Sequence, residues 1–390
     1  MPNEPEKLKS AGRVGLLTFQ WADNFGALLQ AYGLLAWLTE QGIDAFSVNY
    51  APSALRGRDW LFPYAPFRGM SKRTQIKIAV RDFLKNLWTG PAWWAGKRAM
   101  GQFREQYLVK GSWAMRRLAA LSKVDMVQLV VGSDQIWNPE ITFGFQPAYF
   151  GAFEHPRLKK TVAYAASFGT AALPPEAEEE FSRLLDSVSE ISIREKSAAG
   201  YIRTRFHREA VHVADPVFLL RPEQWSAIEE RPSERGYILY HETEYNEELR
   251  RTAYQLAEEK KLALVELSYK KKRQAMAFQT AYPSVPSRIV YSAGPRQFLG
   301  YIHGADYVVS SSFHALAFCL LFHRPFCTRN HRAVPARIDS LLETVGLTGR
   351  MAREDYHPDI DAETDWAAVD ESLQAITDRS KEYLLRSLMS

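Results

Sequence analysis

Short apolar runs alternate with longer amphipathic segments along most of the chain, and this alternation predicts an α/β protein. The runs expected to be strands in the first part of the chain are 13–19, 44–50, 126–131, 161–166, 191–193 and 211–214. A strongly helical stretch at 25–38 separates the first two runs, so the chain opens with a βαβ unit. Such a unit is nearly always right-handed and indicates a parallel sheet.

A second series of the same kind begins near residue 226, after a polar stretch that contains proline. The runs expected to be strands there are 237–241, 262–267, 288–291, 307–309 and 325–328. We therefore expect an N-terminal α/β domain at 1–225 and a C-terminal α/β domain at 226–365, facing each other across a cleft. The amphipathic segment 366–390 is well placed to pack back on the first domain.

The stretch 52–123 departs from this alternation. It holds 15 Lys or Arg residues against three acids, together with five of the ten tryptophans. Within it, cations recur every four residues from Arg73 to Lys85, and apolar side chains fall on another side of the same predicted helix. A basic amphipathic helix at 73–88 either covers the sheet or lies on an anionic membrane surface, and the pattern leaves both open.

Composition narrows the classes of function. A length of 390 residues suggests two domains, and 46% hydrophobic with 24% charged residues is ordinary for a soluble globular protein. The net charge of +4 gives little support for a nucleic-acid partner. Cys319 and Cys327 match no metal-ligand spacing and are expected to be buried free thiols. With no apolar h-region and no membrane-length apolar run, a cytoplasmic protein is expected.

The stretch 306–322 joins a predicted strand, a polar turn and a helix. Open α/β sheets bind ligands where their strands end. Ser311 and Ser312 stand at the helix start, where unpaired N–H groups and the helix dipole favour phosphate or carboxylate. His314 could donate a proton near neutral pH. A simpler interpretation also fits, in which Ser312 only caps the helix and His314 is a buried histidine.

Polar residues also follow strands of the first domain. Arg194 could grip phosphate or carboxylate with its planar fork, or form an ion pair with Asp215. Ser133, Asp134 and Gln135 make another strand-end group. Asp134 is a candidate base for a hydroxyl group, but it could equally hold the turn through backbone amides.

Three further residues are candidates for contact with a sugar. Asp23 and Asn24 stand at the first strand-to-helix turn, where they could face an acceptor or cap the helix. Trp137 could stack on a sugar ring or pack in the core.

Several fragments, taken in order, resemble one family. They are LLTFQWADNFGALLQAYGLLAWL, VVGSDQIWNP, AYAASFG, ISIREKSA, ADPVFLL and SAGPRQFLGYIHGADYVVSSSFHALAF followed by RPF. Their order and spacing resemble the polysaccharide pyruvyl transferase family over roughly residues 13 to 350. The sequence departs from the usual family pattern at Ala315, where many relatives carry glycine, and at Gln20, which bears on the acceptor side.

The resemblance implies two Rossmann-like domains similar to GT-B glycosyltransferases. It also implies an enzyme that transfers the enolpyruvyl unit of phosphoenolpyruvate onto a saccharide or lipid-linked glycan, usually as a cyclic ketal. The resemblance implies neither a metal nor a cofactor. Relatives act on cell-surface or exported glycans, so a position at the inner face of the membrane is expected. The catalytic and donor-binding residues under this interpretation are His314, Arg194, Asp134, Ser311 and Ser312. Those facing the acceptor are Asp23, Asn24, Ser133, Gln135 and Trp137.

Two rival functions share the expected architecture. One is a GT-B glycosyltransferase that uses a nucleotide sugar, because it too would hold anionic donor groups at the helix starts of the second domain. The other is a catalytically inactive relative that binds a glycan or a membrane surface. The sequence alone does not separate them.

Overall fold

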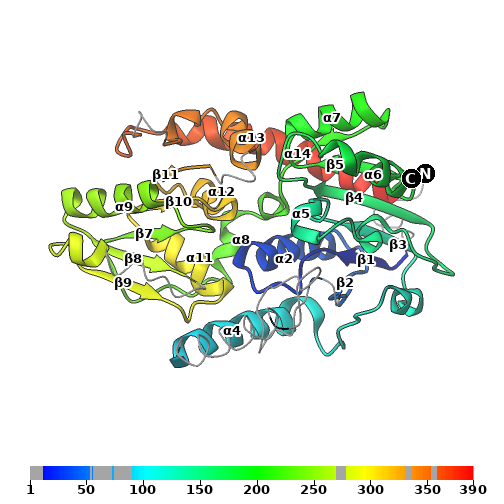
Figure 1. Ribbon diagram of the computed structural model, residues 1–390, viewed down its shortest axis with the longest axis horizontal. Helices are drawn as coiled ribbons and strands as arrows, with labels where there is room; N and C mark the ends of the chain where they lie inside the picture. Colours follow the sequence, from blue (N-terminus) through cyan, green and yellow to red (C-terminus); the bar gives the residue numbers. More distant parts are fainter. Residues whose placement is uncertain are drawn as a thin grey trace.

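The computed structural model describes residues 12–52, 55, 73, 90–268, 278–330, 336–352 and 358–389, and its strands form two parallel sheets (Figure 1). The first sheet has the order β2-β1-β3-β4-β5-β6. Its strands are β1 (Val14–Leu17), β2 (Ala45–Ser47), β3 (Gln128–Val131), β4 (Lys160–Ala166), β5 (Glu190–Ile193) and β6 (Val211–His212). Each begins and ends within two residues of a predicted apolar run, except β2, which ends three residues early.

The second sheet has the order β11-β10-β7-β8-β9. Its strands are β7 (Tyr237–His241), β8 (Ala263–Leu267), β9 (Ser287–Val290), β10 (Tyr307–Ser310) and β11 (Phe326–Thr328). Every pairing in both sheets is parallel. Parallel strands need covering on both faces, which explains their nearly continuous apolar sequences. The prediction of two α/β, Rossmann-like units is confirmed, and the change of sheet falls between β6 and β7.

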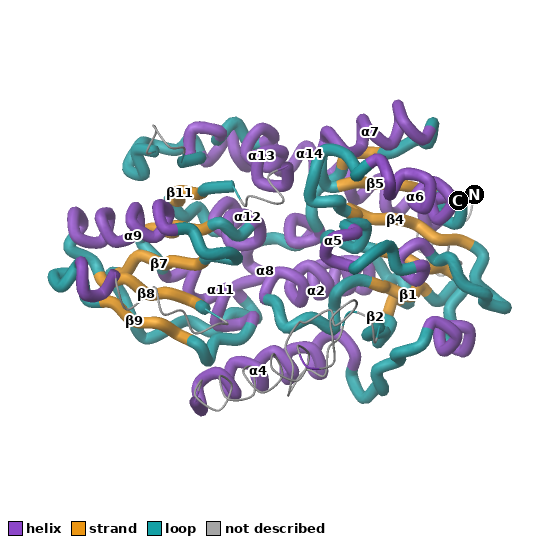
Figure 2. Tube along the Cα trace, viewed as in Figure 1, coloured by secondary structure: helices purple, strands orange, loops and turns teal. Residues whose placement is uncertain are grey.

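Helices cover the sheets, as Figure 2 shows. Those of the first half are α2 (Phe25–Glu40), α4 (Gly90–Arg104), α5 (Pro139–Thr142), α6 (Glu178–Leu185), α7 (Lys196–Phe206) and α8 (Pro222–Ser226). Those of the second half are α9 (Glu247–Lys260), α11 (Pro295–Gly304), α12 (Phe313–Leu321), α13 (Ala336–Thr344) and α14 (Trp366–Met389). Sequence analysis missed α7, because it assigned no helix between the expected strands at 191–193 and 211–214.

The last helix, α14, packs on the first sheet although it follows the second sheet in the chain. The Ser380 hydroxyl accepts a hydrogen bond from the Ala214 amide at 2.8 Å. Near the other end of α14, the Gln128 side chain donates to the Leu388 carbonyl at 2.9 Å. This crossing fixes the second half of the chain against the first.

The two halves meet along α2. Phe25, at its start, stacks on Phe298 of α11 with ring centroids 4.6 Å apart. One continuous apolar core therefore includes residues of both sheets. Below α2, α4 lies along the lower edge of the molecule, between α2 and α11 (Figure 1).

Two sequence predictions concern membranes and thiols. Apart from residue 73, the basic helix expected at 73–88 lies outside the described residues. Within the described part of the chain, no helix is long and apolar enough to cross a membrane. Cys319 and Cys327 are buried free thiols, as predicted.

Candidate functional site

The carboxyl ends of strands from both sheets deliver charged side chains to one place. Asp134 follows β3, Arg194 follows β5 and Asp215 follows β6, while His314 stands in the first turn of α12, just after β10. Arg337, from the first turn of α13, completes the group. We call these five residues the cleft cluster. All of them are buried except Arg337, which is partly exposed.

Asp215 is the centre of the cleft cluster. Its Oδ2 accepts a hydrogen bond from Arg194 Nη1 at 2.5 Å and one from the Ser133 hydroxyl at 3.2 Å. His314 Nε2, from the other half of the molecule, lies 3.7 Å from the same oxygen. The ion pair between Arg194 and Asp215 that sequence analysis kept as an alternative therefore exists. It does not remove Arg194 from the site, because it places the guanidinium beside His314.

Burial and neighbouring charges set the protonation of the Asp215 carboxyl. Burial alone raises its pKa, but the adjacent His314 side chain and the Arg194 guanidinium outweigh burial and hold the pKa below its ordinary value. Asp215 is therefore an anion at neutral pH.

Arg337 is the member of the cleft cluster that sequence analysis missed. Its guanidinium lies 6.0 Å from the centre of the Phe313 ring, and the Arg194 guanidinium lies 4.5 Å from the same ring. Burial, together with the charge of Arg194, lowers the pKa of Arg337 to about 10. Two guanidinium groups so close together repel each other, and an anion bound between them would relieve that repulsion. A cation in the first turn of a helix is disfavoured by the helix dipole. The position of Arg337 at a helix start was therefore a signal in the sequence that this residue has a functional role.

Several N–H groups of the cleft cluster have no hydrogen-bond acceptor among the described residues. They are Arg194 Nε, Arg194 Nη2, Arg337 Nε and His314 Nε2, all buried. Arg194 Nη2 is 3.6 Å from Asp134 Oδ1, and Arg194 Nε is 4.0 Å from Glu195 Oε1, which are distances of ion pairs rather than hydrogen bonds. Buried donors are nearly always paired, so this group is arranged to receive acceptor oxygens.

The approach of His314 to the first half depends on a glycine. Gly26 of α2 faces the imidazole, and a Cβ atom at that position would lie 2.0 Å from His314 Nδ1. Only a residue without a side chain allows α2 and α12 to come this close. The His314 ring is thus held between α2 on one side and Asp215 on the other.

The serines at the start of α12 have structural partners. Ser312 is the N-cap of the helix and accepts a hydrogen bond from the Ala315 amide at 3.4 Å. The Ser311 hydroxyl accepts from the Thr243 amide at 3.2 Å. The capping role kept as the simpler interpretation is therefore real for Ser312, and the predicted donor contacts of both serines stay predictions.

The strand-end group after β3 is tied into the same region. The Asp134 carboxylate accepts from the Gln135 amide at 2.9 Å and lies 4.0 Å from Arg337 Nη1. Ser133 is fully buried and donates to Asp215, while Gln135 accepts from the side chain of Asn138 at 3.0 Å. Asp134 holds its turn and also faces Arg194 and Arg337. It is therefore the member of this strand-end group that belongs to the cleft cluster.

The first strand-to-helix turn is held by other partners. Asn24 caps α2 by accepting from the Ala27 amide at 3.1 Å. Asp23 pairs with Arg104 at 2.8 Å and with Lys97 at 3.2 Å, both from α4. Burial raises the pKa of Asp23, but these two cations outweigh burial and hold it below its ordinary value. Both residues thus have structural roles, and contact with an acceptor stays a prediction.

Trp137 requires a correction. Its side chain is fully buried, its ring stacks on Phe150 at 5.2 Å, and its indole N–H donates to the Tyr149 carbonyl at 2.9 Å. Neither face is open to a sugar ring. Trp137 is therefore withdrawn as an acceptor contact, because the aromatic core of the first sheet uses both its faces and its one donor.

Glu195 is a second acid that sequence analysis gave no role. It is fully buried, and its Oε1 accepts a hydrogen bond from the Ser167 hydroxyl. Its Oε2 has no partner among the described residues. Burial raises the pKa of Glu195, against the opposing effect of Arg194. This carboxyl adjoins the cleft cluster, with its Oε1 4.0 Å from Arg194 Nε.

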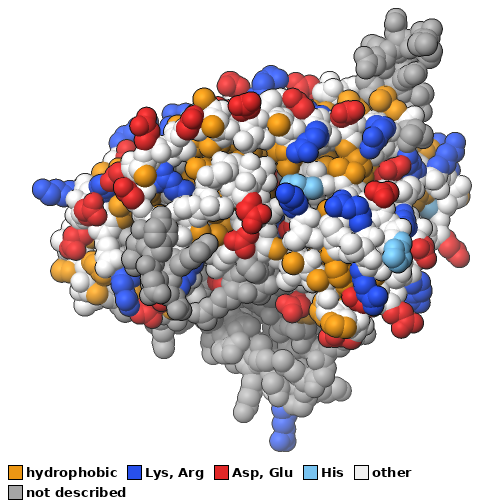
Figure 3. Space-filling view, turned by 90° about the horizontal axis from the view of Figure 1, so that it is seen from above, with side chains coloured by type: hydrophobic (Ala, Val, Ile, Leu, Met, Phe, Trp, Pro, Cys, Tyr) orange, Lys and Arg blue, Asp and Glu red, His pale blue; other side chains and the backbone are white. Residues whose placement is uncertain are grey.

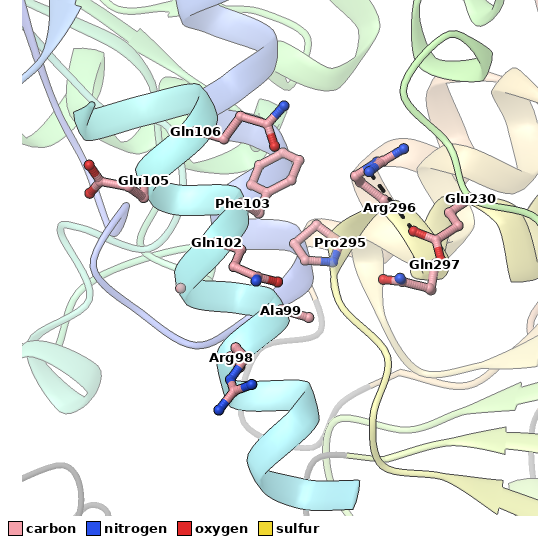
Figure 4. Close-up of a pocket in the computed structure, with 11 residues that line it drawn as sticks. Arg98, Ala99, Gln102, Phe103, Glu105, Gln106, Glu230, Pro295, Arg296 and Gln297 are labelled. Carbon is pink, nitrogen blue, oxygen red and sulfur yellow. Dashed lines mark ion pairs between the residues drawn. The ribbon is translucent and has the colours of Figure 1, made fainter. Parts of the chain in front are cut away.

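Three hollows described by the structure adjoin the interface between the halves. One, of about 570 Å³, lies between α7 and α13 and is lined by no member of the cleft cluster. A narrow one is lined by Arg194, Asp215, Phe313 and Arg337, and so belongs to the cleft cluster. A larger one, of about 790 Å³, lies between α4 and the start of α11 (Figure 4). There Arg98 and Gln102 of α4 stand across from Arg296 and Gln297, but no member of the cleft cluster lines it. Because charged side chains of the cleft cluster line the narrow hollow, we take the narrow hollow as the candidate site.

The described residues contain no group of three or more His, Cys, Asp or Glu side chains arranged to hold a metal ion. The groups gathered in the cleft cluster are two guanidiniums, an imidazole and two carboxylates. Together they can bind an anion, move a proton to it and accept a proton from a hydroxyl group.

Comparison with known proteins identifies a family. A family model described as polysaccharide pyruvyl transferase matches residues 24–331. A search of curated proteins found no match. Among solved structures, the chain is similar to UDP-GlcNAc 2-epimerase from Neisseria meningitidis bound to UDP-GlcNAc (11% identity, 95% of this chain and 92% of that chain, TM-score 0.45). It is also similar to LpCGTa in complex with UDP (12% identity, 97% and 99%, TM-score 0.43). Likenesses this distant add nothing to the fold described above.

Proposed function

Because the chain belongs to the polysaccharide pyruvyl transferase family, and so to the transferases, we propose that it uses phosphoenolpyruvate as donor and forms a pyruvate ketal on a saccharide. The acceptor would offer a pair of hydroxyl groups, as part of a polysaccharide or a lipid-linked glycan. The donor brings two anionic groups, a phosphate and a carboxylate. The proposed site must therefore bind two anions and move protons between donor and acceptor.

The observation that carries this proposal is the set of buried N–H groups without acceptors in the cleft cluster. Arg194 from the first half and Arg337 from the second line one hollow. His314 Nε2 lies 3.7 Å from Asp215, which lines the same hollow. Each guanidinium can bind phosphate or carboxylate through two parallel hydrogen bonds. With one arginine for each anion, the two halves of the molecule would close around a single small donor.

In the proposed reaction His314 protonates the methylene carbon of phosphoenolpyruvate. This leaves an oxocarbenium-like carbon, to which the first acceptor hydroxyl adds while its proton passes to Asp134. Departure of phosphate regenerates an electrophilic carbon, the second hydroxyl attacks it, and the ketal closes with loss of that proton. Asp215 would hold the imidazole of His314 in position for this step, because its Oδ2 lies 3.7 Å from His314 Nε2.

The acceptor would approach from the side of the first domain. Asp134 is the described carboxylate that faces both arginines, and Ser133 and Gln135 flank it. In this arrangement Asp23 and Asn24 would act through the position of α2, which holds His314 in place through Gly26. The acceptor sugar would thus meet the donor across the interface between the two halves.

The proposal is tested by incubating the protein with phosphoenolpyruvate and a mixture of lipid-linked glycans, and following phosphate release. His314→Ala and Arg194→Ala are expected to abolish release, whereas the exposed residues His323 and Arg251 provide matched controls, as His323→Ala and Arg251→Ala. No release by the wild-type protein, together with tight binding of a nucleoside diphosphate, would favour a nucleotide-sugar glycosyltransferase instead. Release that survives both cluster variants would mean that the site lies elsewhere.

A further inference from the structure

One loop of the basic, aromatic segment carries a tryptophan in full contact with solvent. Residues 110–117 follow the helical segment Glu105–Val109 and lead into the 3₁₀ helix Leu118–Lys123. At the tip of this loop Trp113 is 94% exposed, far more than the other exposed large apolar residues of the described chain, such as Trp94 at 48%. From the features below we infer that this loop, here called the Trp113 loop, docks the protein on an anionic membrane surface.

The Trp113 loop is held rigidly on both sides of its tip. On one side, the Ser112 carbonyl accepts from the Asn49 side chain at 2.7 Å, and the Ser112 amide donates to the Val109 carbonyl at 2.8 Å. On the other side, the Met115 amide donates to the Asn49 carbonyl at 2.7 Å, and its carbonyl accepts from the Ala51 amide at 2.8 Å. Trp113 is therefore presented by a fixed scaffold, so little conformational entropy is lost when it binds.

Most of the charge around Trp113 is positive. Lys110, Arg116 and Arg117 are all exposed, and none of them forms an ion pair with an acid that the structure describes. The nearby acid Glu105 keeps its negative charge, but its carboxylate accepts the Gly111 amide at 2.7 Å and pairs with none of the three cations. On the face of the molecule seen from above, by contrast, acids and bases are interspersed (Figure 3). Three cations around one apolar tip complement a surface of anionic headgroups.

The shape of the loop favours a membrane over the other anionic partners. Tryptophan prefers the boundary between headgroups and acyl chains, where its ring is apolar and its N–H stays hydrated. A single-stranded nucleic acid would instead require a groove with several stacking platforms. The Trp113 loop is a projecting tip, and it lines none of the hollows described for this protein. A projecting tip such as Trp113 can insert into a flat lipid surface without a groove around it.

Vesicle flotation tests the inference with the full-length protein. The wild-type chain is expected to float with vesicles of phosphatidylglycerol and phosphatidylcholine, and to stay unbound with phosphatidylcholine alone. Reversing Lys110, Arg116 and Arg117 to Glu should weaken this binding by more than roughly a hundredfold, since each lost cation contributes about fivefold and each new carboxylate is repelled by the surface. Trp113→Ala should weaken it several-fold, and more visibly at high salt, where the electrostatic part is screened.

A matched triple variant separates local docking from net charge. Lys159, Lys261 and Arg386 are also exposed cations. Reversing them to Glu changes the net charge by the same amount as the triple variant of the Trp113 loop. This variant should lose much less binding than the Trp113 loop variant. Equal losses in the two triple variants, no flotation of the wild-type protein, or retention on single-stranded DNA in place of vesicles would each overturn the inference. Phosphate release with a water-soluble acceptor should be unchanged in the loop variants, so the outcome is independent of the proposed reaction.

Discussion

Adding one methyl group at Gly26 should disable the site without removing any of its functional groups. A Cβ atom there would lie 2.0 Å from His314 Nδ1 and 2.4 Å from Cγ, whereas ordinary contact begins near 3.4 Å. The imidazole would therefore have to move by about 1.4 Å, the difference between these distances. Because a misplacement of about 1 Å can lower turnover on the order of 100-fold, Gly26→Ala should raise the barrier by about 2.7 kcal/mol.

A second glycine provides the control for this experiment. Gly200 lies within α7, and a Cβ atom at that position would meet nothing within 4 Å. Gly200→Ala should therefore keep wild-type turnover and gain up to about 1 kcal/mol of stability, as expected for alanine in a helix. Phosphate release from phosphoenolpyruvate and thermal unfolding would be measured for both variants. A Gly26→Ala protein that folds and turns over at the wild-type rate would refute the role assigned to the position of His314.

Three further predictions concern buried charges. Arg337→Gln should weaken phosphoenolpyruvate binding by about 10- to 100-fold, the loss expected for charge-assisted hydrogen bonds; calorimetry that gives an unchanged Kd would exclude Arg337 from the donor site. The pKa of Asp215 is lowered in the folded state, so its contribution to stability is complete at neutral pH and is lost as the pH falls through the ordinary carboxyl range toward that lowered pKa. Asp215→Asn should thus cost about 3–5 kcal/mol at pH 7 and less in acid; urea unfolding that shows the same loss at pH 3.5 would contradict this. Arg250 is fully buried and bonds both oxygens of Glu266, at 2.6 and 2.8 Å, and one of Glu242, at 2.8 Å. Arg250→Met should cost about 3–5 kcal/mol, and neutralising Glu242 and Glu266 as well should recover part of the loss in urea titrations, because the single variant leaves two buried carboxylates unpaired.

The sheets could be predicted from the sequence because their strands are apolar runs bounded by polar residues or glycine. Helix α2 was equally clear, from its apolar side and its Asn24 cap. Helix α7 was missed because KSAAGYIRTRF has a central glycine and only a weak apolar face. The apolar pattern therefore located the strongly buried elements, but it did not reveal a helix in which only Ala198, Ala199 and Ile202 are buried.

The candidate site was predictable in part, for a similar reason. Strand ends can be located from sequence, so Arg194, Asp134 and His314 could be named, and the structure brings them together. Asp215 was foreseen only as an alternative partner of Arg194. Arg337 could not be assigned, because its position depends on how the second half folds back over the first. Trp137 was misassigned because stacking on Phe150 and stacking on a sugar require the same kind of side chain.

The central claim is that His314 protonates the methylene carbon of phosphoenolpyruvate. Running the reaction in deuterium oxide with a saccharide acceptor, and analysing the product by mass spectrometry and NMR, tests it most directly. The account predicts one solvent deuterium in the methyl group of each ketal, release of phosphate in equal amount, and loss of both in His314→Ala. A product whose methyl group carries no solvent deuterium, or transfer of a sugar from a nucleotide donor with no ketal formed, would contradict it.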